Sequence, residues 1–132
     1  MTSRDEARGK AAVEELKKLG CHPHYHQLDV DDESSVMKIR DYLKSTYGGL
    51  DVLVNNAAIA FKADAKEPFS EQATVTLRTN FFNTYRACNI LFSILKPHAR
   101  VVNVSSSVGH LHKISGQDAV SVSLREKLAS PD

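Results

Sequence analysis

Short apolar segments alternate with longer amphipathic segments along most of the chain. Residues 50–55 and 100–104 are mostly apolar and show no alternation of polar and apolar positions, and a further short segment, 25–30, follows Pro23. Runs of this kind are typical of strands covered on both faces, as in a parallel sheet flanked by helices. The three segments are therefore predicted to be strands.

Segments with a helical period lie around these strands. Ala12, Leu16 and Leu19 recur at the spacing of one helix face. Ser3 and Glu6 have the spacing of a capping box at the start of that helix. The predicted helices cover 3–19, the segment from Asp31 or Asp32 to Gly48, and about Glu71 to Leu95, ended by Pro97.

The resulting order, α-β-α-β-α-β, implies parallel strands joined by crossover helices in an α/β fold. The 132 residues are enough for one modest domain, predicted to span 1–132. Residues 108–132 are polar and weakly patterned. They are predicted to form an irregular tail with one helical stretch near 122–128.

Composition narrows the function classes. The net charge is +1, so no strong field attracts nucleic acid or an anionic membrane. Cys21 and Cys88 lack the spacing of a metal or redox site, and two reduced thiols favour a cytoplasmic location. Residues 1–6 do not resemble a signal peptide, and no apolar stretch approaches membrane-spanning length.

The motif Asn55-Asn56-Ala57-Ala58 directly follows a predicted buried strand. In open parallel α/β sheets, ligands bind just beyond such strand ends. Ser105-Ser106-Ser107 follows another predicted strand in the same way. The alternative for both motifs is a plain polar strand end.

Together these motifs resemble the short-chain dehydrogenase/reductase family, and most closely its monomeric, NADPH-dependent carbonyl reductase branch. The matching segments are His26–Asp32, Tyr47–Ala57, Thr79–Phe82 and Arg100–Ser106. The resemblance implies a partial Rossmann-type, doubly wound parallel sheet. It also implies reduction of a small-molecule ketone, aldehyde or quinone with hydride from NADPH, without nucleic acid or membrane partners.

The same resemblance assigns roles to individual residues. Hydride arriving at a carbonyl carbon builds negative charge on the oxygen, which needs a hydroxyl donor and a general acid. By resemblance, Ser106 is that donor and Asn80 holds an ordered water. The implied cofactor residues are Arg4 and Arg8 at the 2′-phosphate, Asp29 and Val30 at the adenine, and Asn56 and Ala57 along the cofactor. The implied substrate residues are Phe61, Lys62, Ala63, Gln72 and Ser106.

Two family motifs are absent from the sequence. No glycines have the Gly-x-x-x-Gly-x-Gly spacing of the phosphate-binding loop, and no tyrosine is followed four residues later by lysine. Equivalents of only the third, fourth and fifth family strands are identified. Without its usual neighbour, segment 25–30 is expected either to stand unpaired or to pair with segment 50–55. We therefore expect a fragment without reductase activity and with weak or no NADPH binding.

Other interpretations remain open from the sequence. The alternative is a non-catalytic truncated remnant that at most associates with other chains. Arg4, Arg8 and Lys10 also fit a solvated helix face. His22, His24 and His26 alternate as metal ligands on a strand do, although Pro23 interrupts them and no Cys or carboxylate has matching spacing.

Overall fold

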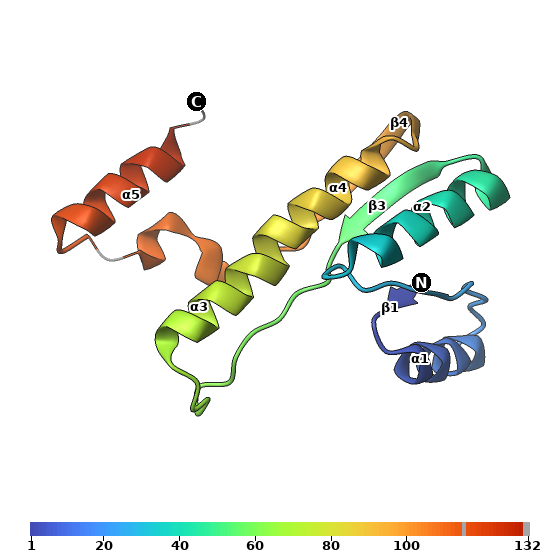
Figure 1. The fold of residues 1–132 in the computed structure, drawn as a ribbon, viewed down its shortest axis with the longest axis horizontal. Coiled ribbons are helices and arrows are strands. Elements are labelled where there is room, and N and C mark those ends of the chain that lie inside the picture. Colours follow the sequence, from blue (N-terminus) through green and yellow to red (C-terminus); the bar gives the residue numbers. More distant parts are fainter. Residues whose placement is uncertain (115, 131–132) are drawn as a thin grey trace. The chain divides into compact units, whose positions relative to one another are not determined.

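The computed structural model describes residues 1–114 and 116–130 (Figure 1). The chain divides into two compact units, Met1–Val102 and Asn103–Asp132. The first unit contains β1 (Thr2–Ser3), α1 (Glu6–Lys18), β2 (His26–Gln27), α2 (Glu33–Tyr47), β3 (Leu50–Asn55), α3 (Phe69–Leu77), a π-helix (Arg78–Asn83), α4 (Thr84–Phe92) and nearly all of β4 (Leu95–Asn103). The second contains two short 3₁₀ turns and α5 (Ala119–Ala129).

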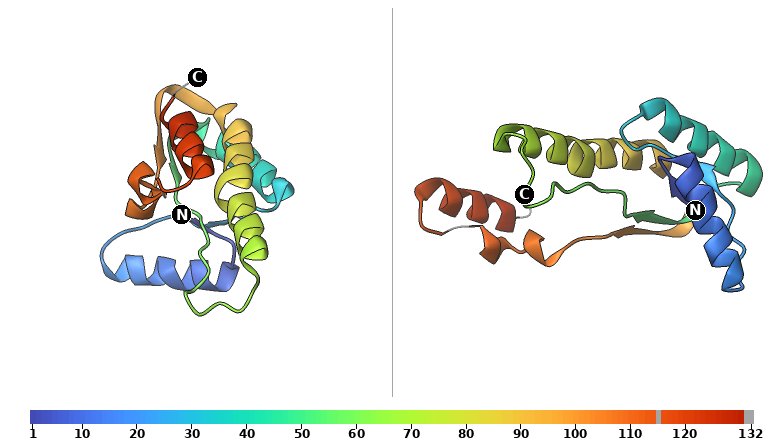
Figure 2. Two further views of the ribbon diagram at one scale, coloured as in Figure 1. Left: turned by 90° about the vertical axis from the view of Figure 1, so that its left-hand side faces the viewer. Right: turned by 90° about the horizontal axis from the view of Figure 1, so that it is seen from below.

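The described strands form two separate two-stranded sheets. β1 pairs with β2 in parallel, with Thr2 opposite His26 and Ser3 opposite Gln27. β3 pairs with β4, and the two arrows point the same way (Figure 2). Both expectations for segment 25–30 are wrong: it neither stands unpaired nor pairs with segment 50–55, because Thr2 and Ser3 supply its neighbour. The parallel α/β class is confirmed.

The second strand is shorter than predicted. β2 covers only His26–Gln27 of the predicted 25–30. Beyond it the chain turns, because the amide of Asp29 donates to the Ser35 hydroxyl at 3.0 Å and the amide of Asp31 donates to the Asp29 carboxylate at 3.0 Å. The side chains of Ser35 in α2 and of Asp29 thus take the place of strand partners, and the strand ends.

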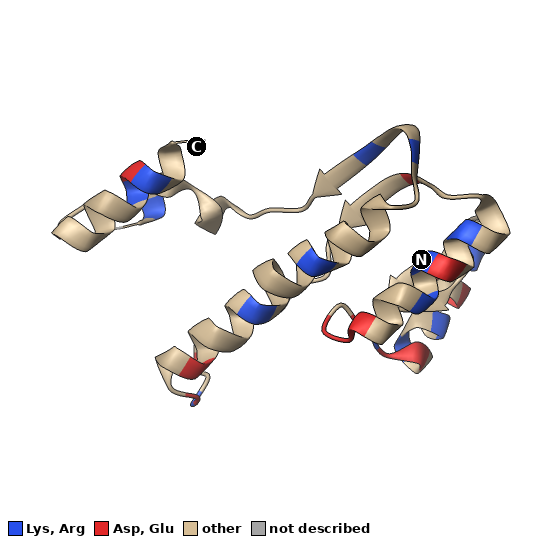
Figure 3. Ribbon diagram, turned by 45° about the horizontal axis from the view of Figure 1, so that its top comes forward, with Lys and Arg blue, Asp and Glu red and all other residues tan. Residues whose placement is uncertain are grey.

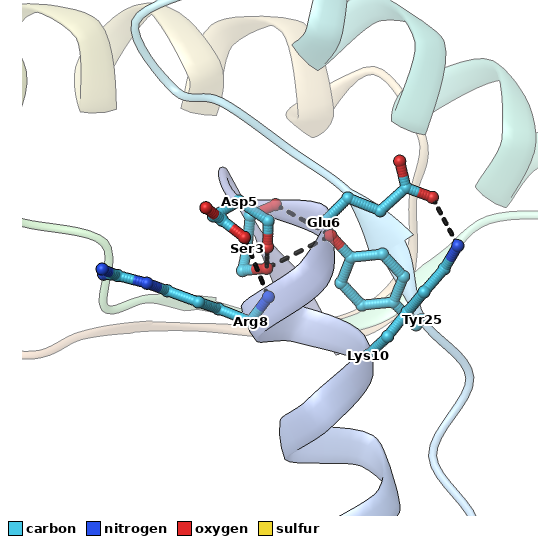
Figure 4. A network of polar contacts seen from close by, with 6 residues as sticks. All are labelled: Ser3, Asp5, Glu6, Arg8, Lys10 and Tyr25. Atoms are coloured by element: carbon cyan, nitrogen blue, oxygen red, sulfur yellow. Dashed lines mark hydrogen bonds and ion pairs between the residues drawn. The ribbon is translucent and has the colours of Figure 1, made fainter.

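The cap of α1 also differs from the prediction. Asp5, not Ser3, is the N-cap, and its carboxylate accepts from the amide of Arg8 at 2.8 Å. Ser3 instead donates to the carbonyl of Asp5 and lies 3.2 Å from the Tyr25 hydroxyl, while Glu6 pairs with Lys10 (Figure 4). The Ser3 hydroxyl therefore joins β1 to the start of α1 and to Tyr25 in the loop before β2.

The ends of α2 agree with the sequence. Asp32 is the N-cap and accepts from the amide of Ser34 at 2.9 Å. Gly48 is the C-cap with φ 73°, a left-handed conformation that favours glycine. α2 then packs on α4, and Val36, Ile39, Ala87, Leu91 and Ile94 form the buried core of the first unit.

The predicted long helix is interrupted and shorter at its end. α3 and α4 are joined by the π-helix, and α4 ends at Phe92 rather than at the predicted Leu95. Pro97 lies inside β4, which begins at Leu95. The apolar residues 94–95 that suggest a last helical turn instead begin the strand, and the carbonyl of Ile94 accepts from the amide of Leu50 at 2.9 Å.

The second unit is more regular than the polar pattern suggests. α5 covers Ala119–Ala129, somewhat longer than the predicted helical stretch. Its N-cap is Asp118, whose carboxylate accepts from the amide and hydroxyl of Ser121 at 2.8 and 2.7 Å. Among the described residues, no helix is long and apolar enough to cross a membrane.

Candidate cofactor site

The end of β3 is held by contacts to the helix behind it. The Asn55 amide nitrogen lies 3.1 Å from the Cys88 sulfur, in a contact that joins β3 to α4. Asn56, Ala57 and Ala58 are exposed beyond this point. The motif predicted to lie along a cofactor is therefore anchored at its first residue and open at the next three.

The segment after this motif is anchored a second time, by Asn80. Its side-chain oxygen accepts from the amide of Ile59 at 2.8 Å, and its side-chain nitrogen donates to the carbonyl of Ile59 at 2.8 Å. Asn80 lies in the π-helical segment, and single π-turns of this kind are frequent at functional sites. In this state, both polar atoms of the side chain hold the loop, and neither is directed to a catalytic water.

A hollow of about 220 Å³ brings together four of the six predicted cofactor residues. Arg4 follows β1, Asp29 and Val30 follow β2, and Ala57 follows β3. The lining of the hollow is Thr2, Ser3, Arg4, Leu28, Asp29, Val30, Asp31, Ala57, Ala58, Ile59 and Thr79. Residues far apart in the sequence thus meet at the C-terminal ends of three strands, where ligands bind in such sheets.

The other two predicted cofactor residues lie outside this hollow. Asn56 lines a larger neighbouring groove. Arg8 is exposed on α1, and its side chain points away from the polar network around Ser3 and Tyr25 (Figure 4). Their roles stay predictions.

Arg4 and two carboxylates set the charge of the hollow. The Arg4 side chain is exposed, and its carbonyl accepts from the Gln27 side chain at 3.1 Å. The Asp29 carboxylate accepts from the amide of Asp31 at 3.0 Å. The Asp31 carboxylate accepts from the Thr79 hydroxyl at 3.0 Å and the Asn83 amide at 2.8 Å. Both carboxylates are thus engaged in internal hydrogen bonds, whereas the guanidinium is available to an anion.

Asp31 is a positioning residue that the sequence reasoning missed. It joins the loop after β2 to the π-helix, and its carbonyl also accepts from Arg86 at 3.3 Å. Thr79, one of its partners, is buried at 4% exposure. The signal in the sequence is the acidic run Asp29, Asp31 and Asp32, which predicts a helix cap at Asp31 or Asp32 but not this network.

Ser106 lies in the second unit, where it precedes a 3₁₀ turn. Its hydroxyl oxygen accepts from the amide of Val108 at 3.4 Å, so it caps the turn Ser107–Gly109. The side chain is exposed. The role of Ser106 as the donor to a substrate carbonyl stays a prediction.

The predicted substrate residues lie on the long loop after β3 and at the start of α3. Phe61 is half-buried, and the carbonyl of Lys62 accepts from the amide of Ala65 at 3.1 Å in a turn that encloses Ala63. The Gln72 side chain donates to the carbonyl of Glu67 at 2.7 Å and so closes the loop onto α3. These residues lie outside the lining of the hollow, and their substrate role stays a prediction.

The alternating histidines make aromatic contacts. The His26 ring lies 4.8 Å from the Tyr42 ring, and the His24 ring lies 6.4 Å from that of Tyr47. Over residues 1–114 and 116–130, no group of three or more His, Cys, Asp or Glu side chains is arranged to hold a metal ion.

Comparison with known proteins identifies the family. A family model described as short chain dehydrogenase matches residues 1–118. The chain belongs to this family. It is 57% identical over 109 residues to carbonyl reductase (NADPH) 3 of Mus musculus, across 83% of this chain and 39% of the relative. It is 56% identical over 117 residues to carbonyl reductase (NADPH) 1 of Bos taurus, across 87% of this chain and 42% of the relative.

Solved structures of family members agree with the fold. Salutaridine reductase from Papaver somniferum matches with a TM-score of 0.75 and 26% identity, over 97% of this chain and 61% of that one. Menthone neomenthol reductase from Mentha piperita matches with a TM-score of 0.72 and 26% identity, over 98% and 64% of the two chains. These matches confirm the predicted partial Rossmann-type architecture.

The chain spans about two fifths of the length of the curated carbonyl reductases it matches. This agrees with the prediction that the sequence corresponds to only part of such an enzyme. It also agrees with the absence of the glycine-rich loop and of the Tyr-x-x-x-Lys pair from these 132 residues.

Proposed function

We propose that this chain forms the 2′-phosphate and adenosine side of an NADPH site in a carbonyl-reductase-like protein, and that the 132 residues alone do not reduce carbonyls. The hollow that joins Arg4, Asp29, Val30 and Ala57 carries the proposal. Residues from three strand ends converge there, with an exposed guanidinium at its rim.

Arg4 determines the preference for NADPH over NADH in this proposal. A guanidinium presents a planar fork of donors that matches a phosphate group. The carboxylates of Asp29 and Asp31 are already hydrogen-bonded to protein groups, so they oppose the anion less than free carboxylates would. Val30 and Ala57 supply apolar surface for the adenine and its ribose.

In the whole family reaction, bound NADPH supplies hydride to the carbonyl carbon. The part assigned to this chain is to bind the carbonyl oxygen through the Ser106 hydroxyl and to hold the cofactor loop through Asn80. A general acid has to protonate that oxygen, and no tyrosine of this chain has its lysine partner. Loss of a general acid lowers the rate by about 10²- to 10⁴-fold. The proposed substrates remain small ketones, aldehydes and quinones.

Ligand binding tests the cofactor half of the proposal. The purified chain is titrated with 2′,5′-ADP and with 5′-ADP, which differ by the phosphate assigned to Arg4. We expect 2′,5′-ADP to bind more tightly, and Arg4→Ala to abolish the difference. Arg100→Ala, which removes an exposed arginine outside the hollow, is the matched control. Equal binding of the two nucleotides would refute the assignment.

The catalytic half is tested by NADPH oxidation with menadione against a heat-killed blank. We expect no difference from the blank. A rate above it would mean that these residues include a general acid that the sequence does not reveal.

We further propose that the protein is monomeric and cytoplasmic, in line with its resemblance to the monomeric branch and with two free cysteines.

A non-catalytic interaction protein is the second candidate. The observation that favours it is the absence of the glycine-rich loop and of the Tyr-x-x-x-Lys pair from these 132 residues.

A further inference from the structure

A groove of about 470 Å³ lies beside α1 in the first unit. Its lining residues all come from the continuous segment 10–25, so neither β1 nor β3 contributes to it. None of them lines the hollow that contains Arg4. The groove has the volume of a small-molecule site, about 300–1,000 Å³, and it is separate from the proposed cofactor site.

One wall of the groove is a stripe of α1. Lys10, Val13, Glu14 and Lys17 line it, at the i, i+3, i+4 and i+7 spacing of one helix face. Val13 is buried and supplies apolar surface, whereas the charged side chains are exposed. Acidic and basic side chains both lie along α1 (Figure 3). Two lysines less one glutamate give the lining a net charge of +1 with neutral histidines, which favours a singly charged anion.

The other wall consists of four consecutive residues with cyclic side chains. Gly20, in a left-handed conformation with φ 80°, turns the chain back after α1, and the loop then runs beside the helix until Tyr25 reaches Gly9. Residues 22–25, His-Pro-His-Tyr, all line the groove. The proline and the tyrosine are half-buried, and both histidines are exposed. Such side chains present flat surfaces on which an aromatic ring can stack.

The Tyr25 ring is fixed before any ligand binds. Its hydroxyl lies 3.2 Å from the Ser3 hydroxyl and 3.3 Å from the Ser3 carbonyl (Figure 4). The ring also packs against Gly9 so closely that a Cβ there would overlap it. A surface that is already ordered lowers the entropic cost of binding.

Lys10 is the cation of the groove that is available to a ligand. Its Nζ lies 2.7 Å from the Glu6 carboxylate, in a pair whose side chains are 66% and 61% exposed. Exposed pairs contribute only about 0–1 kcal/mol, and Glu6 does not line the groove. Lys17, by contrast, pairs at 2.8 Å with Glu14, which does line it. Lys10 can therefore turn to an anion in the groove at little cost, whereas Lys17 neutralises Glu14.

We propose that this groove binds a flat aromatic monoanion of the arylcarboxylate class. The ring of the ligand stacks on the cyclic side chains of residues 22–25, and its carboxylate accepts a hydrogen bond from Lys10. An inorganic anion would leave the wall of rings uncovered, and a neutral aromatic molecule would leave the ammonium group without an acceptor. The two walls together therefore require a ligand that is both aromatic and anionic.

The test uses the full 132-residue chain and two probes of nearly equal shape, 2-naphthoate and the neutral 2-naphthamide. Isothermal titration calorimetry measures both affinities. We expect 2-naphthoate to bind about fivefold more tightly or better, because only its carboxylate makes a charge-assisted hydrogen bond. In amide NMR spectra, the signals of residues 10–25 should shift on addition of 2-naphthoate, and those of β3 should not.

Protein variants then locate the charge. Lys10→Gln should weaken 2-naphthoate binding by about fivefold and leave 2-naphthamide binding unchanged. Lys18→Gln is the matched control, because Lys18 also makes an exposed 2.7 Å pair on α1, with Glu15, but lies outside the groove lining. It should change neither affinity. Glu14→Gln removes a like charge from the lining and should strengthen 2-naphthoate binding.

Four results would overturn the proposal. The first is the absence of 2-naphthoate binding, and the second is equal affinity for the two probes, which would mean adsorption of the ring alone. The third is equal weakening by Lys10→Gln and Lys18→Gln. The fourth is a set of NMR shifts confined to β3, which would place the probe elsewhere. These measurements contain no nucleotide and alter no residue of the hollow, so their failure is separate from failure of the cofactor site.

Discussion

The side-chain amide of Asn80 and the backbone of Ile59 form a reciprocal pair of hydrogen bonds, both of 2.8 Å. The pair joins the π-helix to the loop that follows Asn56 and Ala57. An asparagine is suited to this role because it carries one donor and one acceptor side by side. The fixed loop in turn forms one wall of the hollow that contains Arg4.

Asn80→Asp is expected to destabilise the protein. The new carboxylate oxygen would face the carbonyl of Ile59 and lose the donated hydrogen bond. We expect a loss of about 1–3 kcal/mol in the free energy of unfolding, the usual cost of leaving a part-buried group unsatisfied. Urea denaturation measures it. Asn89→Asp, at an exposed position of α4, is the control. Equal losses for the two variants would argue against a stabilising role of the Asn80–Ile59 hydrogen bonds.

Gly9 of α1 permits the close approach of Tyr25. A Cβ placed at Gly9 would overlap the Tyr25 ring and the Ser3 hydroxyl. Gly9→Ala is therefore expected to destabilise the unit by about 1–3 kcal/mol through overpacking, against a helix-propensity gain of about 1 kcal/mol. Thermal unfolding measures the net effect.

A double variant separates these two contributions. With Tyr25→Leu in place, the ring atoms that meet the new Cβ are gone and the Ser3 hydroxyl is the remaining close neighbour, so Gly9→Ala should cost clearly less than in the unaltered chain. If alanine remains as costly in the Tyr25→Leu background, the close approach does not explain the glycine.

Asp31 is expected to link stability with nucleotide binding. Asp31→Ala leaves the buried hydroxyl of Thr79 and the amide of Asn83 without their acceptor, at a cost of about 2 kcal/mol or more in unfolding free energy. The loop with Asp29 and Val30 should loosen, so binding of 2′,5′-ADP should weaken as well. Asp64→Ala, an exposed carboxylate in the loop after β3, should change neither quantity.

Much of the fold follows from local sequence signals. The Asp32 cap, the left-handed Gly48 and the apolar run of β3 each depend on a few neighbouring residues, and each prediction is confirmed. Family resemblance on four short segments is enough to identify the architecture, because strand ends in this family carry distinctive polar residues.

Errors arise where a tertiary partner overrides a local pattern. Thr2 and Ser3 contain no strand signal, yet they form β1 because β2 offers them an edge. The Asn80–Ile59 hydrogen bonds join residues 21 positions apart, and the hydrogen bonds of Asp31 reach residues 48 or more positions away. No rule based on sequence spacing detects contacts of this kind. The cofactor roles of Arg4, Asp29, Val30 and Ala57 come from resemblance, and only the structure shows that they border one hollow.

The cap of α2 should make stability depend on acidity. Hydrogen bonds from Ser34, first its hydroxyl and then its amide, hold the pKa of Asp32 below its usual value of 3.8. A group whose pKa is lower in the folded state stabilises the fold above its unfolded pKa, and that contribution is lost as the pH falls through the folded value.

Asp32→Asn keeps an N-cap acceptor but cannot titrate. We therefore expect its unfolding free energy to fall less steeply than that of the unaltered chain as the pH drops below about 3.8. Urea denaturation over that range compares the two slopes, and parallel slopes would show that Asp32 does not contribute to acid sensitivity.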